Sequence, residues 1–85
     1  MRRPSEVEKS AFNELVGISI RRQRHGHGSS QDRFAEAIGI SSSMLQNIEI
    51  GAVPCPLFVA RNIAETVDCT LDDLVPVTID EPVER

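Results

Sequence analysis

Apolar residues recur at helical spacing along most of the chain, and glycine, serine and proline separate the segments in which they do so. The first segment begins at Ser5, which forms a Ser-x-x-Glu capping box with Glu8. Its apolar positions continue to Ile20, and we expect the helix to end near Gly26 or Gly28. These positions fall on two faces, one with Phe12, Val16 and Ile20 and the other with Val7, Ala11 and Ile18. A helix with two apolar faces is expected to contact two surfaces.

Shorter helical segments follow the first helix. Ser30 is a suitable N-cap for a two-turn helix that Gly39 ends, and Ser41 is a suitable N-cap for the next one. Thr70 and Asp73 form a second capping box near the end of the chain. The predicted helices span residues 31–38, 40–50, 57–67 and 71–75. Together with the first helix they predict an all-α, compact domain of five helices.

Charge is distributed unevenly along the 85 residues, whose net charge is −4. Residues 1–18 are neutral, residues 19–47 carry four arginines against two acids, and residues 48–85 carry two arginines against eight acids. The middle of the chain is therefore the part that can face an anion such as nucleic acid. No stretch approaches about 18 consecutive apolar residues, and no signal-peptide pattern is visible. We expect a soluble, cytoplasmic protein with no membrane partner.

Motifs for catalysis and metal binding are missing from the sequence. Neither a nucleophile–base pair nor a glycine-rich phosphate loop is visible, so we expect no enzyme activity, no catalytic residues and no cofactor. His25 and His27 stand close together, but their spacing to Cys55 and Cys69 fits no zinc pattern, so we expect no metal site. An exposed, oxidisable thiol at Cys55, which lies between two prolines, stays open as an alternative.

Ala35 and Gly39 have the spacing of two helices joined by a sharp turn. Such helices need a small residue where their backbones approach, and the turn needs a residue that tolerates positive φ. Ile40 can then enter the core before the second helix begins. This spacing predicts a helix-turn-helix over about residues 30–49, although Ala-x-x-x-Gly by itself is shared by many helical hairpins.

A longer pattern of residues surrounds this turn without an insertion. It comprises Arg21, Arg24, Gly28, Ser30, Gln31, Ala35, Gly39, Ile40, Ser41, Leu45, Ile48, Glu49, Gly51, Pro56, Ile63, Ala64, Leu71, Asp72, Asp73 and Leu74. Together these positions resemble the Cro and lambda-repressor-like (XRE-type) helix-turn-helix family. The resemblance implies a lambda-repressor-like DNA-binding domain at residues 12–75. Residues 1–11 would then extend the first helix, and residues 76–85 would form an acidic C-terminal tail.

The resemblance also implies which residues contact DNA. In the family, the equivalents of Gln31 and Ser41 face phosphates, which agrees with helix N-termini as anion sites. Asn47 is the most discriminating residue of the second, recognition helix, because an amide can bond both N6 and N7 of adenine. The outward face of that helix holds Ser42, Ser43, Gln46 and Asn47, and the arginines left for phosphates are Arg21, Arg22 and Arg33. A solvated polar surface is the alternative for each of these residues.

Arg24 and Glu49 match a family pair that forms a salt bridge between the first helix and the end of the recognition helix. Other positions depart from the family. The loop after Gly51 carries no lysine or arginine, and Asp68 replaces the usual glycine after the fourth helix. Few cations predict a shallow salt dependence of DNA binding, and they leave open that DNA binding has been weakened or lost.

These features predict a sequence-specific DNA-binding transcription regulator, namely a repressor that binds a palindromic double-stranded operator as a homodimer. Its size suggests autoregulation, and we expect it in the cytoplasm, on the nucleoid when bound to DNA. The alternative is a protein-binding adaptor, such as an antitoxin or an anti-repressor, that uses the acidic C-terminal half to bind a protein partner. Dimer contacts are expected from one of two apolar groups, either Val7, Ala11 and Ile18 or Val77 and Ile79.

Overall fold

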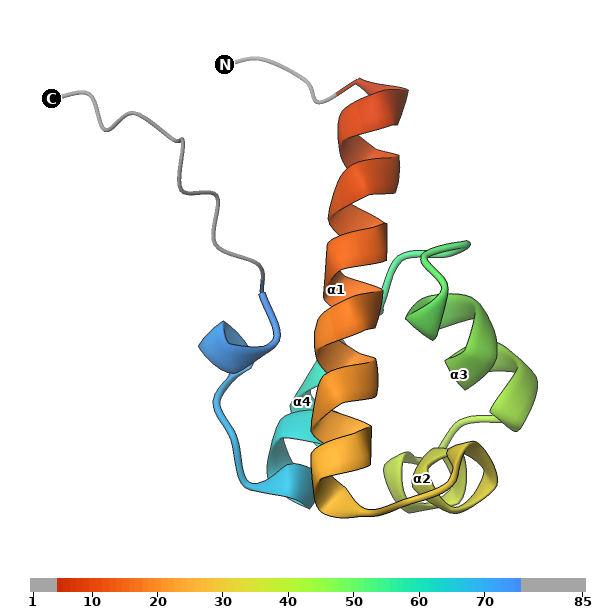
Figure 1. Cartoon of the computed structure of the whole chain (residues 1–85), viewed down its shortest axis with the longest axis vertical. Helices are drawn as coiled ribbons and strands as arrows, with labels where there is room; N and C mark the ends of the chain where they lie inside the picture. Colours follow the sequence, from red (N-terminus) through yellow and green to blue (C-terminus); the bar gives the residue numbers. More distant parts are fainter. Residues whose placement is uncertain (1–4, 76–85) are drawn as a thin grey trace, which may run out of the picture.

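The computed structural model describes residues 5–75, which form helices and connecting turns without a strand. The elements are α1 (Glu6–His27), α2 (Gln31–Ile38), α3 (Ser42–Glu49), α4 (Leu57–Val67) and the 3-10 helix η1 (Leu71–Asp73). The long helix α1 has α2 and α3 on one flank and α4 on the other (Figure 1). The all-α prediction is confirmed. None of the helices within residues 5–75 is long and apolar enough to cross a bilayer.

The predicted fifth helix is shorter than expected, so the described residues contain four α-helices and one 3-10 turn. Its capping box is present: Thr70 Oγ1 accepts from the backbone N–H of Asp73 at 3.3 Å, and Asp73 Oδ2 accepts from that of Thr70 at 2.9 Å. The helix nevertheless ends at Asp73. Pro76 follows Val75 in the sequence, and a residue that precedes proline is disfavoured in the α conformation. The end of the 71–75 segment is therefore not helical.

Side-chain caps start the first three helices as the sequence predicts. Ser5 and Glu8 form a complete capping box at α1. Ser30 Oγ accepts from the backbone N–H of Arg33 at 3.2 Å, and Ser41 Oγ accepts from that of Met44 at 3.0 Å. Each such cap is worth about 1 kcal/mol. These caps hold the N-terminal N–H groups of α2 and α3 in place.

Left-handed residues end three of the helices, namely Gly28 after α1, Gly39 after α2 and Asp68 after α4. Gly39 has φ +80° between α2 and α3, a conformation that glycine adopts without strain. Asp68 has φ 57° at the end of α4, and it is the one non-glycine residue with positive φ within residues 5–75. A short polar side chain such as aspartate tolerates this conformation better than most. The helix therefore ends here although the glycine typical of the family is missing.

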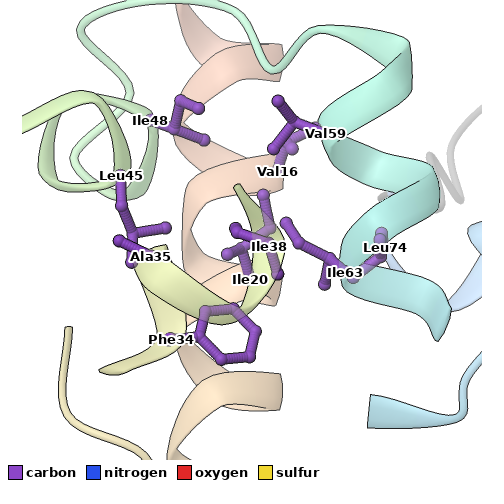
Figure 2. Close-up of a cluster of buried hydrophobic side chains, with 10 residues drawn as sticks. All are labelled: Val16, Ile20, Phe34, Ala35, Ile38, Leu45, Ile48, Val59, Ile63 and Leu74. Carbon is purple, nitrogen blue, oxygen red and sulfur yellow. The ribbon is translucent and has the colours of Figure 1, made fainter. Parts of the chain in front are cut away.

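The hydrophobic core lies where α1, α2, α3 and α4 meet (Figure 2). Phe34 and Ile38 enter it from α2, and Leu45 and Ile48 enter it from α3. The core cluster comprises Val16, Ile20, Phe34, Ala35, Ile38, Leu45, Ile48, Val59, Ile63 and Leu74. In α1 buried residues begin only at Val16. The first half of α1 therefore contributes little to this core.

At Gly17 the backbones of α1 and α3 approach closely. A Cβ atom at Gly17 would lie 2.5 Å from the carbonyl oxygen of Ile48 and closer still to that of Glu49. A methyl group there would force the two helices apart. The approach brings the end of α3 against α1, and so places Glu49 next to the arginines of α1. The sequence pattern did not single out Gly17.

Candidate nucleic-acid interface

The two helices α2 and α3 are joined by residues 39–41 and pack against each other. Leu45 and Ile48 of α3 point into the core, so residues on the opposite side of this helix face outward. These outward residues are Ser43, Gln46 and Asn47, all exposed to solvent. Residues of this kind at the outer face of the second helix can form hydrogen bonds with base edges in a major groove.

Arg24 and Glu49 form a buried, bidentate ion pair between α1 and the end of α3. Arg24 Nε donates to Glu49 Oε2 at 2.7 Å, and Arg24 Nη2 donates to Glu49 Oε1 at 3.0 Å. Arg24 Nη1 also donates to the carbonyl oxygen of Ser29 at 3.0 Å. Within residues 5–75, no buried side-chain nitrogen or oxygen atom lacks a hydrogen-bond partner. No buried polar atom of the pair is therefore left without a hydrogen-bond partner.

Gln31, at the start of α2, is attached to the same carboxylate. Its Nε2 donates to Glu49 Oε1 at 2.9 Å, and the half-exposed Arg21 has its Nε 3.8 Å from that oxygen. An amide nitrogen carries two hydrogens, so the side chain of Gln31 keeps one for another acceptor. Glu49 thus joins α1, α2 and α3 and orients a phosphate-binding candidate.

The charge state of Glu49 follows from its surroundings. Burial alone would raise the pKa of this carboxyl, but hydrogen bonds from Arg24 and Gln31 and the charges of Arg24 and Arg21 outweigh burial and lower the pKa below its ordinary value. Glu49 is therefore ionised at neutral pH. The ionised carboxylate attracts the hydrogen-bond donors around it with a full negative charge.

Ser42, the first residue of α3, donates its hydroxyl proton to Asp32 Oδ1 of α2 at 2.6 Å. Asp32 is exposed and Ser42 is partly buried. The sequence reasoning placed Ser42 among the DNA contacts but missed Asp32. No local sequence signal identifies Asp32, because it lies ten positions before Ser42 and meets it only through the packing of α2 against α3.

The three arginines left for phosphates lie on α1 and α2. Arg21, Arg22 and Arg33 are all exposed. Arg21 leans toward Glu49, whereas no ion pair holds Arg22 or Arg33 within the part of the chain that the structure describes. Two of these cationic side chains therefore lie on α1, and the third lies on α2, the helix that carries Gln31.

The first group of predicted dimer residues lies on the outer surface of α1. Val7 and Ala11 are exposed, and Ile18 is about half exposed. Val77 and Ile79, the second group, lie outside the described residues. An apolar pocket of about 260 Å³ opens beside α1, lined by residues of α1, the 54–57 loop, α4, η1 and Val75. The sequence reasoning did not anticipate this pocket.

The two cysteines are free and partly buried, so the structure does not favour the alternative of an exposed thiol at Cys55. Burial raises the pKa of Cys55 to about 11, which leaves little reactive thiolate at neutral pH. Burial and the charges of Asp73 and Asp68 also raise the pKa of Cys69. Among residues 5–75 no three side chains of the kinds that bind metals gather into a site.

Two short helices in sequence, the second with a polar outer face, define a helix-turn-helix protein. The sequence model of the helix-turn-helix family HTH_3 matches residues 20–74. The chain belongs to this family, and so to the XRE-type class of DNA-binding transcription regulators. A search of curated protein sequences gives no significant match.

Solved structures share the fold. The restriction-modification controller protein C.AhdI from Aeromonas hydrophila has a TM-score of 0.71 at 25% identity, over 75% of this chain and 97% of that one. The clp gene regulator ClgR from Corynebacterium glutamicum has a TM-score of 0.69 at 21% identity, over 74% and 82%. An HTH_3 family transcriptional regulator from Vibrio cholerae has a TM-score of 0.71 at 23% identity, over 78% and 37%.

Proposed function

We propose that the chain is a repressor that binds a specific palindromic operator as a homodimer, with α3 in the major groove. The observation that carries the proposal is the exposed polar face of α3, with Ser43, Gln46 and Asn47 opposite the buried Leu45 and Ile48. Amide and hydroxyl groups on such a face match the donor and acceptor pattern of base edges. We assign base reading to this face.

Backbone contacts come from the starts of α2 and α3. The N–H groups there carry partial positive charge and favour a phosphate. Gln31 can donate its remaining amide hydrogen to a phosphate. Ser41 is the exposed N-cap of α3 and lies beside the start of that helix, where a phosphate would bind. The exposed side chains of Arg22 and Arg33 supply charge. These contacts orient α3 without reading sequence.

Dimerisation would place two copies of α3 about 34 Å apart, in successive major grooves on one side of the DNA. The exposed apolar residues on α1 support association, and the tail residues Val77 and Ile79 are the rival source of contacts. Sedimentation of Ile18→Asp and Ile79→Asp variants distinguishes the two: only the variant that changes the interface becomes monomeric. A wild type that stays monomeric at micromolar concentration and on DNA contradicts the dimer.

The DNA-binding part is tested by a gel shift with the DNA upstream of the protein's own gene, over a series of salt concentrations. We expect a shift at micromolar protein and low salt. Each lost phosphate contact reduces the slope of log K against log salt by about 0.9, so Arg33→Ala gives a shallower slope than wild type. Absence of any shift, on this DNA and on randomised duplexes, contradicts DNA binding.

Sequence reading is tested by Asn47→Ala. Loss of an amide pairing with adenine costs about 1–3 kcal/mol of discrimination at one base position per half-site. The melting temperature should hardly change, because Asn47 is exposed. Glu65→Ala, an exposed change on α4, is the matched control and should alter neither property. A large fall in melting temperature for Asn47→Ala contradicts the assignment.

The second candidate is a protein-binding adaptor, such as an antitoxin or anti-repressor. The apolar pocket of about 260 Å³ and the acidity of residues 48–85 favour it. An adaptor would retain its partner when Asn47 is replaced and lose it when the pocket rim is changed, for example in Leu57→Asp. Leu57 is 75% exposed, so this change spares the core. Replacing Asn47 therefore affects only the DNA-binding function, and replacing Leu57 affects only the adaptor function.

A further inference from the structure

The hydroxyl group of Ser42 differs from the other serine hydroxyls at the start of α3 because its proton already has a partner. Ser42 Oγ lies 2.6 Å from Asp32 Oδ1, a short distance typical of an O–H···O⁻ hydrogen bond. A carboxylate is an acceptor only, so the single hydroxyl proton must point toward Asp32. What Ser42 then presents to another molecule is a pair of oxygen lone pairs.

Asp32 presents acceptors as well. Its Oδ1 binds Ser42, and its Oδ2 has no hydrogen-bond donor among residues 5–75. No ion pair neutralises the charge of Asp32 within those residues. The second residue of α2 and the first of α3 thus combine into one exposed edge that accepts hydrogen bonds and donates none.

This edge lies at the N-terminal end of α3, the end at which recognition helices contact base edges. In the major groove adenine and cytosine present exocyclic amino groups as donors, whereas guanine and thymine present only acceptors at their O6, N7 and O4 atoms. An edge made of acceptors attracts the first pair of bases and repels the second. Without Asp32 the serine hydroxyl could rotate, and it could then donate to or accept from a base, so it would not distinguish the two pairs of bases.

We propose that Asp32 is a specificity-determining residue, which makes Ser42 an obligate acceptor and so selects a base with an exocyclic amine, adenine or cytosine, at one position in each half-site. This inference rests on the proposed DNA-binding function and names a preference at its site. The charge of Asp32 also repels the phosphates near it, so the preference is obtained at the expense of affinity for DNA of every sequence.

The test is a selection of binding sites from a randomised DNA duplex pool, with full-length wild type and single variants. We expect wild type to favour adenine or cytosine by roughly tenfold at one position per half-site, a size typical of a base-edge contact. Asp32→Ala and Ser42→Ala should each reduce that preference to less than about threefold. Preferences at the other positions should stay as they are in wild type.

Glu36→Ala is the matched control, because Glu36 is an exposed acid on the same helix. It removes the same charge without touching Ser42, and so should raise affinity for all sequences while keeping the preference. Two results overturn the inference: a wild-type preference for guanine or thymine at the position, or an Asp32→Ala variant that behaves like Glu36→Ala. Failure of wild type to enrich any sequence is a different result, because it overturns the proposed function and this inference with it.

Discussion

Two carboxylates of the helix-turn-helix, Glu49 and Asp32, accept hydrogen bonds from their neighbours in very different surroundings. Glu49 is 2% exposed and receives donors from Arg24 and Gln31. Asp32 is exposed and receives one, from Ser42. The first carboxylate connects three helices, and the second connects the ends of two.

Burial accounts for the difference in what the two groups do. A charge removed from water must be paired and fully hydrogen-bonded, so the surroundings of Glu49 are restricted to one arrangement. An exposed carboxylate keeps water as an alternative partner and can exchange it for a ligand group. The same chemical group therefore serves stability in one place and is available for recognition in the other.

The largest effect on stability is expected from Arg24→Ala, which tests whether Glu49 depends on its buried partner. The change leaves Glu49 buried with Gln31 as its remaining hydrogen-bond donor, which should cost about 3–5 kcal/mol of unfolding free energy. For a domain of this size the melting temperature should fall by more than about 10 °C in thermal denaturation followed by circular dichroism.

Two controls separate charge pairing from other losses. Arg22→Ala removes an exposed arginine of the same helix and should stay within about 0.5 kcal/mol of wild type. The double variant Arg24→Met/Glu49→Leu replaces the pair by apolar side chains and should recover most of the stability. An Arg24→Ala protein as stable as Arg22→Ala would show that Glu49 does not depend on its partner.

A smaller effect is expected from pH. The pKa of Glu49 is lower in the folded protein than the ordinary value of 4.5, so its ionised form stabilises the fold at pH above that value. This contribution should decline as pH falls below 4.5 and should vanish once the pH passes the folded pKa. Urea unfolding at several pH values measures it, with Glu49→Gln as the reference that lacks the titrating group. A stability difference between the two proteins that does not shrink toward low pH contradicts the pairing.

The smallest effect on stability is expected from Asp32→Ala. An exposed hydrogen bond contributes little to folding, so the unfolding free energy should change by no more than about 0.5 kcal/mol. The same urea unfolding experiment at neutral pH measures it. A loss of several kcal/mol would show that Asp32 acts like Glu49, as part of the fold, and the contrast between the two carboxylates would disappear.

Local chemistry made much of the fold predictable. Each cap depends on residues three apart, so Ser5, Ser30, Ser41 and Thr70 could be assigned from the sequence. The left-handed turn at Gly39 follows from the conformational freedom of glycine. The ion-pair partners Arg24 and Glu49 were accessible only through the family resemblance, because 25 residues separate them and no local rule connects them.

By itself the sequence determined the order and approximate extents of the four α-helices, the serine caps of the first three, and the family. Tertiary structure alone decided which distant groups meet. Because Gly17 lacks a side chain, α3 approaches α1 closely enough for Glu49 to lie beside Arg24 and Arg21. The packing of α2 against α3 likewise brings Asp32 within 2.6 Å of Ser42. Periodicity reports which side of a helix is buried, whereas the partner of a polar side chain depends on where two helices cross.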